Sequence, residues 1–544
     1  MQKRLMQWVL AAIAVSLLAM QPTAARDQPL VSVEWLQKRL GGEITILDTS
    51  MAPTYAEKHI PGAVRVNFYS YGALETTAAD MERRIVSWGV SPGRKVVLYD
   101  EGGTFMATRV FYDLYQMGFP LEDLAVLDGG LARWEAAGAP VTRDPTPKPE
   151  PGTFRVTGVK EDVQVRLPEF LVATGDPANH AVVEALEPSY HFGGANFFGK
   201  GGHIPNGISL PSEDFFNADK TFKSPEEIGR MLAYLGVKRE QQVHSYCGGG
   251  VSAAIPFFAM KFLLDYPRVK LYKGSQREWL RDDRGLPVWT YDAPNVKREM
   301  EWVSGWNNPM MRTFGVAQMN IIDIRSADAY SQGHVPYALS IPADVFRSRI
   351  SDPARLAESL GQAGVNPADE AVIVSNGKLN ERSALAYLVL DALGHKRVSV
   401  LMGSVDDWGL KGLPITKDAT IVGRPKSPRD AAVPPVTYVP SPREGVLIRD
   451  ANATKGLYPK VFIASGKTRP ASAPAGRVIH VPYTDLLNAD GTPKAAKDIW
   501  NVLVKAGVPR YAEIIVFADD PGEAAVNYYI LKLMGFPDVK VLLT

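Results

Sequence analysis

The sequence predicts an α/β protein made of four similar domains in a row. Short β-rich runs alternate with amphipathic helical stretches, and the same order of elements returns at intervals of roughly 130–145 residues, the size of whole domains. The 544 residues are also too many for one hydrophobic core. Strands that alternate with helices indicate βα units on a mainly parallel sheet, with helices covering both faces.

Each repeat begins with a short β-rich run that ends in an acidic residue. These runs cover residues 44–48, 181–184, 321–323 and 446–450. A His-Ile-Pro or His-Val-Pro turn follows, at His59, His203, His334 and, more weakly, His480. Histidine is a common metal ligand, but each of these residues lies in a different repeat beside the same kind of turn. We therefore interpret them as structural turn residues rather than as one metal site.

The later elements of each repeat follow in a fixed order. An amphipathic helix ending in glycine precedes a buried-strand pattern such as 95–99 or 513–517, and a loop, another helix and a further strand come next. A Gly-x-x-x-x-Trp segment then ends at Trp134, Trp279 and Trp408 in the first three repeats, where we expect core packing. We expect the fourth copy to be truncated, because it lacks this segment.

These patterns set the expected domain boundaries. We predict repeats over residues 26–145, 156–292, 298–418 and 432–544. Proline-rich stretches at 144–151 and 424–442 have the composition of linkers.

The first 25 residues have the pattern of a secretory signal peptide. Lys3 and Arg4 precede a mostly apolar run over 5–20, and small residues follow up to Ala25. This apolar run is shorter than the roughly 20 residues that a spanning helix needs. We expect the protein to be periplasmic or secreted, with no membrane association beyond this segment.

Charge and cysteine content narrow the chemistry. The chain has 60 Lys and Arg against 59 Asp and Glu, so bulk charge gives no reason to expect nucleic acid as a partner. Its one cysteine, Cys247, excludes an intramolecular disulfide and a cysteine-cluster metal site. The setting of this thiol therefore decides what it can do.

Cys247 lies in a glycine-rich loop between a strand pattern at 242–246 and an apolar helix pattern from about Ser252 to Leu264. A thiol attacks as the thiolate, so the negative charge must be stabilised. Glycines allow a short loop to turn several amides inward, and a helix start adds unpaired amides. We expect such an anion cradle around the sulfur, formed by Gly248, Gly249, Gly250, Val251 and Ser252. Ser252 is also the expected helix N-cap.

The early Gly-His-Ile-Pro turn, the loop Cys-Gly-Gly-Gly-Val-Ser-Ala-Ala at 247–254 and the closing Gly-x-x-x-x-Trp together resemble the rhodanese sulfurtransferase family. The loop is similar to that of mercaptopyruvate sulfurtransferases and many two-domain rhodaneses. This resemblance implies four rhodanese-like domains, with an inert first repeat, an active second repeat and an added degenerate pair.

The resemblance and the loop together imply a double displacement through a persulfide on Cys247. A small sulfur donor and a thiol or cyanide acceptor are the expected partners, and a protein sulfur acceptor stays open. The reaction calls for no metal and no organic cofactor.

The donor is harder to specify. Relatives that use mercaptopyruvate usually place arginines just after the acid that ends the first strand, and the stretch 184–191 has none. We therefore favour thiosulfate, or another inorganic or persulfide sulfur, over mercaptopyruvate. Candidate substrate-binding residues are His244, which could also help to ionise the thiol, and Lys200, His203, Lys273 and Arg277.

Two other functions, a phosphatase and a non-enzymatic scaffold or carrier, compete with sulfur transfer. Phosphatases that share this fold need an arginine six positions after the cysteine, and that position holds Ala253. A secreted binding scaffold or persulfide carrier without turnover is the stronger alternative. The equivalent loops at 100–107, 375–380 and 519–522 have no thiol, and the acids in the first and last would repel an anion.

Overall fold

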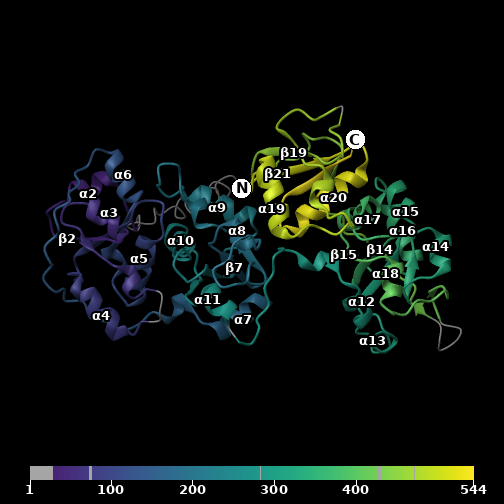
Figure 1. Ribbon diagram of the computed structural model, residues 1–544, viewed down its shortest axis with the longest axis horizontal. Coiled ribbons are helices and arrows are strands. Elements are labelled where there is room, and N and C mark those ends of the chain that lie inside the picture. The colour runs from purple at the N-terminus through teal and green to yellow at the C-terminus, as the bar shows by residue number, and fades with distance from the viewer. Residues whose placement is uncertain (1–28, 73–75, 282, 425–430, 471, 544) are drawn as a thin grey trace, which may run out of the picture. The chain divides into compact units, whose positions relative to one another are not determined.

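The computed structural model describes residues 29–72, 76–281, 283–424, 431–470 and 472–543 (Figure 1). The chain divides into two compact units, which are described separately. The first contains Met1–Leu186, Leu210–Gly229 and Arg239–Glu278, and the second contains Glu187–Ser209, Arg230–Lys238 and Trp279–Thr544. The predicted signal segment 1–25 lies outside the described residues. Within the described ranges, every helix is too short or too polar to cross a membrane.

Four five-stranded sheets share one strand order. The first runs β1 (Leu30–Val31), β5 (Leu124–Leu127), β4 (Lys95–Tyr99), β2 (Ile44–Asp48), β3 (Val64–Arg65). The second runs β6 (Gln164–Val165), β10 (Val269–Tyr272), β9 (Gln242–Tyr246), β7 (His180–Glu184), β8 (Gly207–Ser209). The third runs β11 (Lys297–Arg298), β15 (Arg397–Leu401), β14 (Glu370–Val374), β12 (Met319–Asp323), β13 (Ala338–Ser340). The fourth runs β18 (Leu447–Ile448), β22 (Val539–Leu542), β21 (Glu513–Phe517), β19 (Lys460–Ala464), β20 (Val478–His480).

The expected parallel pairing is confirmed. All adjacent strands of the first, third and fourth sheets are parallel, as are β6, β10, β9 and β7 of the second. A two-stranded pair, β16 (Ile421–Val422) and β17 (Ala432–Val433), is additional. The protein is therefore α/β with several parallel sheets.

One strand assignment in the fourth repeat was wrong. The expected first strand at 446–450 contains only the edge strand β18, which pairs with β22. The strand that pairs on both sides, as β2 does in the first sheet, is β19. A hydrophobic run alone does not distinguish an edge strand from a central one, and β19 ends at Ala464 without the acid used as a guide.

Helices occupy most connections between strands. In chain order they are α2 (Val33–Gln37), α3 (Ala52–Glu57), α4 (Ala78–Ser87), α5 (Met106–Gln116), α6 (Gly130–Ala136), α7 (Leu167–Gly175), α8 (Pro188–His191), α9 (Pro225–Tyr234), α10 (Ala254–Phe258), α11 (Ser275–Arg281), α12 (Met300–Trp306), α13 (Pro309–Thr313), α14 (Ala327–Gln332), α15 (Ala343–Ser348), α16 (Pro353–Gln362), α17 (Glu381–Ala392), α18 (Val405–Leu410), α19 (Ala496–Ala506) and α20 (Pro521–Leu533). The helix after the central strand is largely buried in α5, α10, α17 and α20, because it packs against other helices as well as its sheet.

The repeated tryptophans and two of the repeated histidines are structural, as expected. Trp134, Trp279 and Trp408 are fully buried, and each indole N–H donates to a proline carbonyl at 2.9–3.0 Å. In His59 and in His334, each ring nitrogen lies 2.8–3.1 Å from a backbone carbonyl oxygen.

The first proline-rich segment is tied to its repeat rather than free. The Asp144 carbonyl lies 3.1 Å from His59 Nε2, and the Gly152 amide donates to the Val86 carbonyl at 2.8 Å. Phe154, just beyond it, is buried. In the second segment β17 pairs with β16 and Tyr438 is buried.

Candidate active site

Cys247 is the first residue after the central strand β9, at the carboxyl end of the second sheet. The loop from Cys247 leads into α10, which continues as one π-helical turn over Ala259–Leu263. The expected N-cap role of Ser252 was wrong: Ala253 takes that position and makes no side-chain capping bond. The N-cap lies one residue later than its apolar pattern suggests, so the loop keeps one more amide outside the helix.

The sulfur of Cys247 accepts a backbone hydrogen bond. The Gly250 N–H donates to Sγ at 3.1 Å. The amides of the other predicted cradle residues, Gly248, Gly249, Val251 and Ser252, have no hydrogen-bond partner in the described part of the chain. Cys247 is only 2% exposed, so the thiol is sheltered, and the amides without a partner lie within five residues of it in the same loop. Such a group of amides can stabilise a thiolate or a second sulfur atom.

The loop conformation depends on Gly250. Its φ of +76° lies in the left-handed region, and a Cβ built there would come within 2.5 Å of the Lys273 carbonyl oxygen. Only glycine fits such a close backbone approach. At Gly249, in contrast, φ is not positive and a Cβ would meet nothing within 4 Å.

The first turn of α11 fixes the start of the loop. The Cys247 N–H donates to Ser275 Oγ at 3.1 Å, and the Cys247 carbonyl accepts from the Gln276 N–H at 3.0 Å. The Gly248 carbonyl accepts from the Arg277 N–H at 2.8 Å. These bonds use the Cys247 amide and two carbonyl groups, so the amides of Gly248, Gly249, Val251 and Ser252 are not involved in them.

A buried polar cluster on α5 of the first repeat contacts the same loop. Arg109 Nη1 donates to the Gly250 carbonyl at 2.7 Å, while its Nε lies 3.2 Å from Asp113 Oδ1. Lys273 Nζ donates to Gln116 Oε1 at 2.6 Å and lies 3.6 Å from Asp113. Since Arg109 and Asp113 are almost fully buried, the first repeat is part of the site although it has no thiol.

Sequence reasoning missed these α5 residues. Their only signal is an arginine and an aspartate four residues apart on a helix whose neighbours are mostly apolar. Buried charges are rare unless they are paired, so such a pair on a buried helix could have been noticed.

Two predicted residues, Lys273 and Arg277, line one cavity of about 410 Å³. Arg109 and Arg166 also line it, and Glu278 is the only acid among its lining residues. The excess of cationic side chains suits an anionic ligand. Cys247 does not line this cavity directly; Arg109 connects the two through the Gly250 carbonyl.

His244 bonds to another histidine rather than to the Cys247 thiol. Its Nε2 lies 3.0 Å from His180 Nδ1, and its ring meets the edge of Phe170. Burial lowers the pKa of His244 to about 3, so the imidazole is neutral near pH 7 and supplies no positive charge.

Lys200 and His203 belong to the second compact unit, whereas Cys247 belongs to the first, so their part in substrate binding stays a prediction. His203 forms a cluster with His191 and Asp292, whose ligand atoms lie within 4.8 Å of one another and could hold a metal ion. Asp292 already accepts from His191 Nε2 at 2.6 Å, and the two imidazoles stack at 3.7 Å. Because His191 Nε2 uses its proton in this bond, it offers no lone pair to a metal ion, and we interpret the pair as hydrogen-bonded; His203 Nε2 lies 3.6 Å from the same carboxylate oxygen.

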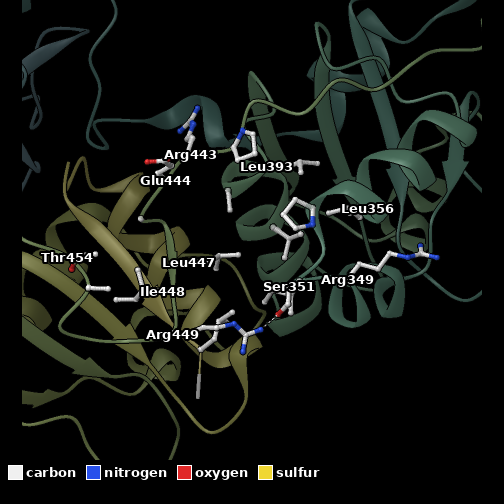
Figure 2. A pocket seen from close by; sticks show the side chains of 18 of the residues that line it. Arg349, Ser351, Leu356, Leu393, Arg443, Glu444, Leu447, Ile448, Arg449 and Thr454 are labelled. Atoms are coloured by element: carbon white, nitrogen blue, oxygen red, sulfur yellow. Dashed lines mark hydrogen bonds between the residues drawn. The ribbon is translucent and has the colours of Figure 1, made fainter.

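A second cavity, of about 600 Å³, occurs in the second unit at the corresponding sheet edge (Figure 2). Arg449 follows β18 there as Arg166 follows β6 in the first unit. Figure 2 shows Arg449 bonded to Ser351. The cavity lining combines apolar side chains such as Leu356, Leu393 and Leu447 with charged residues, and none of its lining residues is a cysteine.

Comparisons with known proteins agree with this fold. A family model described as rhodanese-like domain matches residues 32–137 and 310–411. A putative thiosulfate sulfurtransferase from Synechococcus elongatus is 30% identical over 52% of this chain and 93% of its own length. A probable 3-mercaptopyruvate sulfurtransferase from Pseudomonas aeruginosa is 30% identical over 44% of this chain and 87% of its own length. A sulfur carrier protein from Thermus thermophilus is 27% identical over 47% and 94%.

The chain is thus an α/β protein with rhodanese-like domains. It belongs to the rhodanese sulfurtransferase family.

Proposed function

We propose that the protein is an exported sulfurtransferase of four rhodanese-like domains, in which Cys247 moves sulfane sulfur from a donor such as thiosulfate to a thiophilic acceptor. The observations that support this most are the amide bond to Sγ and the neighbouring loop amides that have no partner. One of them, Gly250 N–H, bonds to the sulfur, and four neighbouring amides have no other partner within the described ranges.

The reaction is a double displacement. The Cys247 thiolate attacks the outer sulfur of thiosulfate, a new S–S bond forms, and sulfite leaves with the electron pair of the broken S–S bond. The loop amides then hold the negative terminal sulfur of the persulfide. An acceptor nucleophile, cyanide or a thiolate, attacks that terminal sulfur and releases the Cys247 thiolate.

An anionic inorganic donor is supported by the charged groups near the loop. Lys273, Arg277 and Arg109 line one cavity beside it. The stretch after the acid Glu184 has no arginine, which argues against mercaptopyruvate. The named relatives include both thiosulfate and mercaptopyruvate types at the same identity, so they do not decide between donors.

Sulfur transfer from thiosulfate to cyanide or a dithiol tests the proposal. We expect turnover by the native chain, none by Cys247→Ser or Cys247→Ala, and unchanged turnover by Asp100→Ala, which alters the matching loop of the first repeat. A parallel assay with mercaptopyruvate should be slower. Turnover by the Cys247 variants would contradict the assignment.

A persulfide carrier without turnover of small donors is the second candidate. One relative is named a sulfur carrier protein, and Cys247 is only 2% exposed, which suits storage of a sheltered sulfur. A carrier would accept one sulfur per chain and release it only to a protein acceptor. Multiple turnovers with cyanide would exclude this alternative.

Export is supported by the basic head and apolar run of residues 1–25. The N-terminus of the protein recovered from its native cell tests this point. We expect it to begin near Arg26 and to be found in the periplasm or medium.

A further inference from the structure

A third cavity, of about 480 Å³, lies within the first repeat and away from the residues of the Cys247 loop. Strand β3, helix α4 and the proline-rich segment at 145–149 form its walls. Three cationic residues, Arg65, Arg84 and Lys148, are among its lining residues, and no aspartate or glutamate is. A cavity with this balance of charge attracts anions.

Two buried hydrogen-bond donors in the lining have no partner. Arg65 Nε and Thr146 Oγ1 are both inaccessible and unbonded in the described chain. Leaving a buried polar group unsatisfied costs about 1–3 kcal/mol, and native proteins rarely do so without a reason. Both residues line the cavity and both can donate hydrogen bonds, as recognition of an oxyanion requires.

Arg84 is held in place at the cavity without an ion pair in the described ranges. Its guanidinium donates to Ser70 Oγ at 3.2 Å and lies over the Tyr71 ring, 5.2 Å from the centroid. The preceding residue, Arg83, pairs instead with Asp80 on the exposed side of α4. The two neighbouring arginines therefore differ in partner and in place: only Arg84 lines the cavity.

The arginine at the edge of the first sheet is absent from the matching position of the third sheet. Arg65 pairs in register with Asp48 at the edge of the first sheet, and the same register in the third sheet places Ser340 opposite Asp323. The cation is therefore not a general requirement of the sheet edge.

We propose that this cavity binds a small organic oxyanion, a phosphate or sulfonate group carried on an aromatic or short apolar body. The guanidinium groups of Arg65 and Arg84 would hold the oxyanion, since arginine binds such groups through paired N–H donors. Tyr55, Trp88 and the prolines line the rest of a volume typical of small-molecule sites. An inorganic ion alone would leave these apolar walls uncovered.

Calorimetric titration of the full chain with phenyl phosphate, benzenesulfonate and inorganic phosphate tests this proposal. We expect phenyl phosphate or benzenesulfonate to bind more tightly than inorganic phosphate, and binding to weaken as salt is added. Arg65→Gln and Arg84→Gln should each weaken binding at least about tenfold, whereas the adjacent control Arg83→Gln should leave it unchanged.

Several results would overturn the proposal. These are no binding of either organic probe at roughly millimolar concentration, equal affinity for inorganic phosphate, or an equal loss in Arg83→Gln. If Arg65→Gln does not fold, Thr146→Val removes the second unpartnered donor without changing charge, and unchanged binding in both Thr146→Val and Arg84→Gln would likewise contradict the site.

Discussion

The loops that follow β4 and β9 share a backbone framework but differ in the group at its centre. Asp100 and Cys247 are each the first residue after the central strand of their sheet. In both loops this residue's carbonyl accepts from the next strand–helix turn, at 2.8 Å for Asp100 and 3.0 Å for Cys247. Each loop also contains a glycine with positive φ, Gly103 at +67° and Gly250 at +76°.

The difference lies in what the inward-facing amides bind. In the first repeat the Asp100 carboxylate accepts from the Gly102 and Ala107 amides at 2.9 and 3.0 Å. In the second repeat a small sulfur is at that position and four amides stay unbonded among the described residues. The first loop therefore supplies its own anion, and the second can accept one from outside. The matching residues in the other two repeats, Ser375 and Ala518, provide neither thiol nor carboxylate.

Removing the thiol should have the largest effect. Cys247→Ser keeps the loop geometry but replaces the nucleophile with a poorly ionised hydroxyl. We expect sulfur transfer to fall by at least about 1,000-fold, with thermal stability close to that of the native chain. Steady-state rates and a thermal melt of the same preparation measure both quantities. Residual activity above one tenth of the native rate would show that Cys247 is not the residue that carries the sulfur.

Distorting the loop while keeping the thiol comes next. Gly250→Ala places a Cβ within 2.5 Å of the Lys273 carbonyl at positive φ, so the loop must move. We expect a loss of roughly 100-fold, the size found when a donor to a developing anion is removed. Gly249→Ala is the matched control, since its Cβ meets open space and its φ is not positive. Equal losses in the two variants would show that the Gly250 conformation is not what matters.

The contribution of the first repeat can be measured at Arg109. Arg109→Met removes the bond to the Gly250 carbonyl and leaves Lys273, 3.6 Å away, as the ion-pair partner of the buried Asp113 among the described residues. We expect about a tenfold fall in kcat and a stability loss of about 3–5 kcal/mol. The double variant Arg109→Met with Asp113→Leu should regain much of the stability but not the rate. Recovery of both would show that Arg109 acts only on folding.

The smallest effect on activity is expected at Asp100. Asp100→Asn changes the loop without a thiol, so sulfur transfer should stay within about twofold of native. Burial raises the pKa of Asp100, so the folded state binds its proton more tightly than the unfolded state does. Protein stability contributed by this group therefore falls as pH rises above the unfolded value near 3.9. In denaturant unfolding, the free energy of unfolding of Asp100→Asn should rise relative to that of the native chain between pH 4 and pH 7. A relative fall over this range would contradict the burial argument.

The sequence predicted the fold through patterns that are local. Buried runs such as 95–99 and 513–517 became β4 and β21, and the repeated Gly-x-x-x-x-Trp segments became buried tryptophans. A two-residue edge strand carries too short a pattern to be told from a central strand. The apolar run that contains β18 was therefore assigned the place that β19 occupies.

The candidate site also contains residues whose setting is local in sequence and residues whose setting is not. Cys247 and Gly250 could be identified because their chemistry depends on neighbours in the chain. Arg109 and Gln116 act on residues more than 140 positions away, and only the packing of α5 against the second repeat shows this. His244 is near the thiol in sequence, but its ring is buried and bonds to His180, as a core histidine would.

The most direct test of the account is the mass of the native chain after exposure to thiosulfate, followed by peptide mapping. We predict a gain of one sulfur atom on the peptide that contains Cys247, removed by cyanide or a reductant and absent in Cys247→Ser. A native chain that stays folded yet gains no sulfur from thiosulfate or any other sulfane donor would contradict the claim that the loop amides stabilise a persulfide.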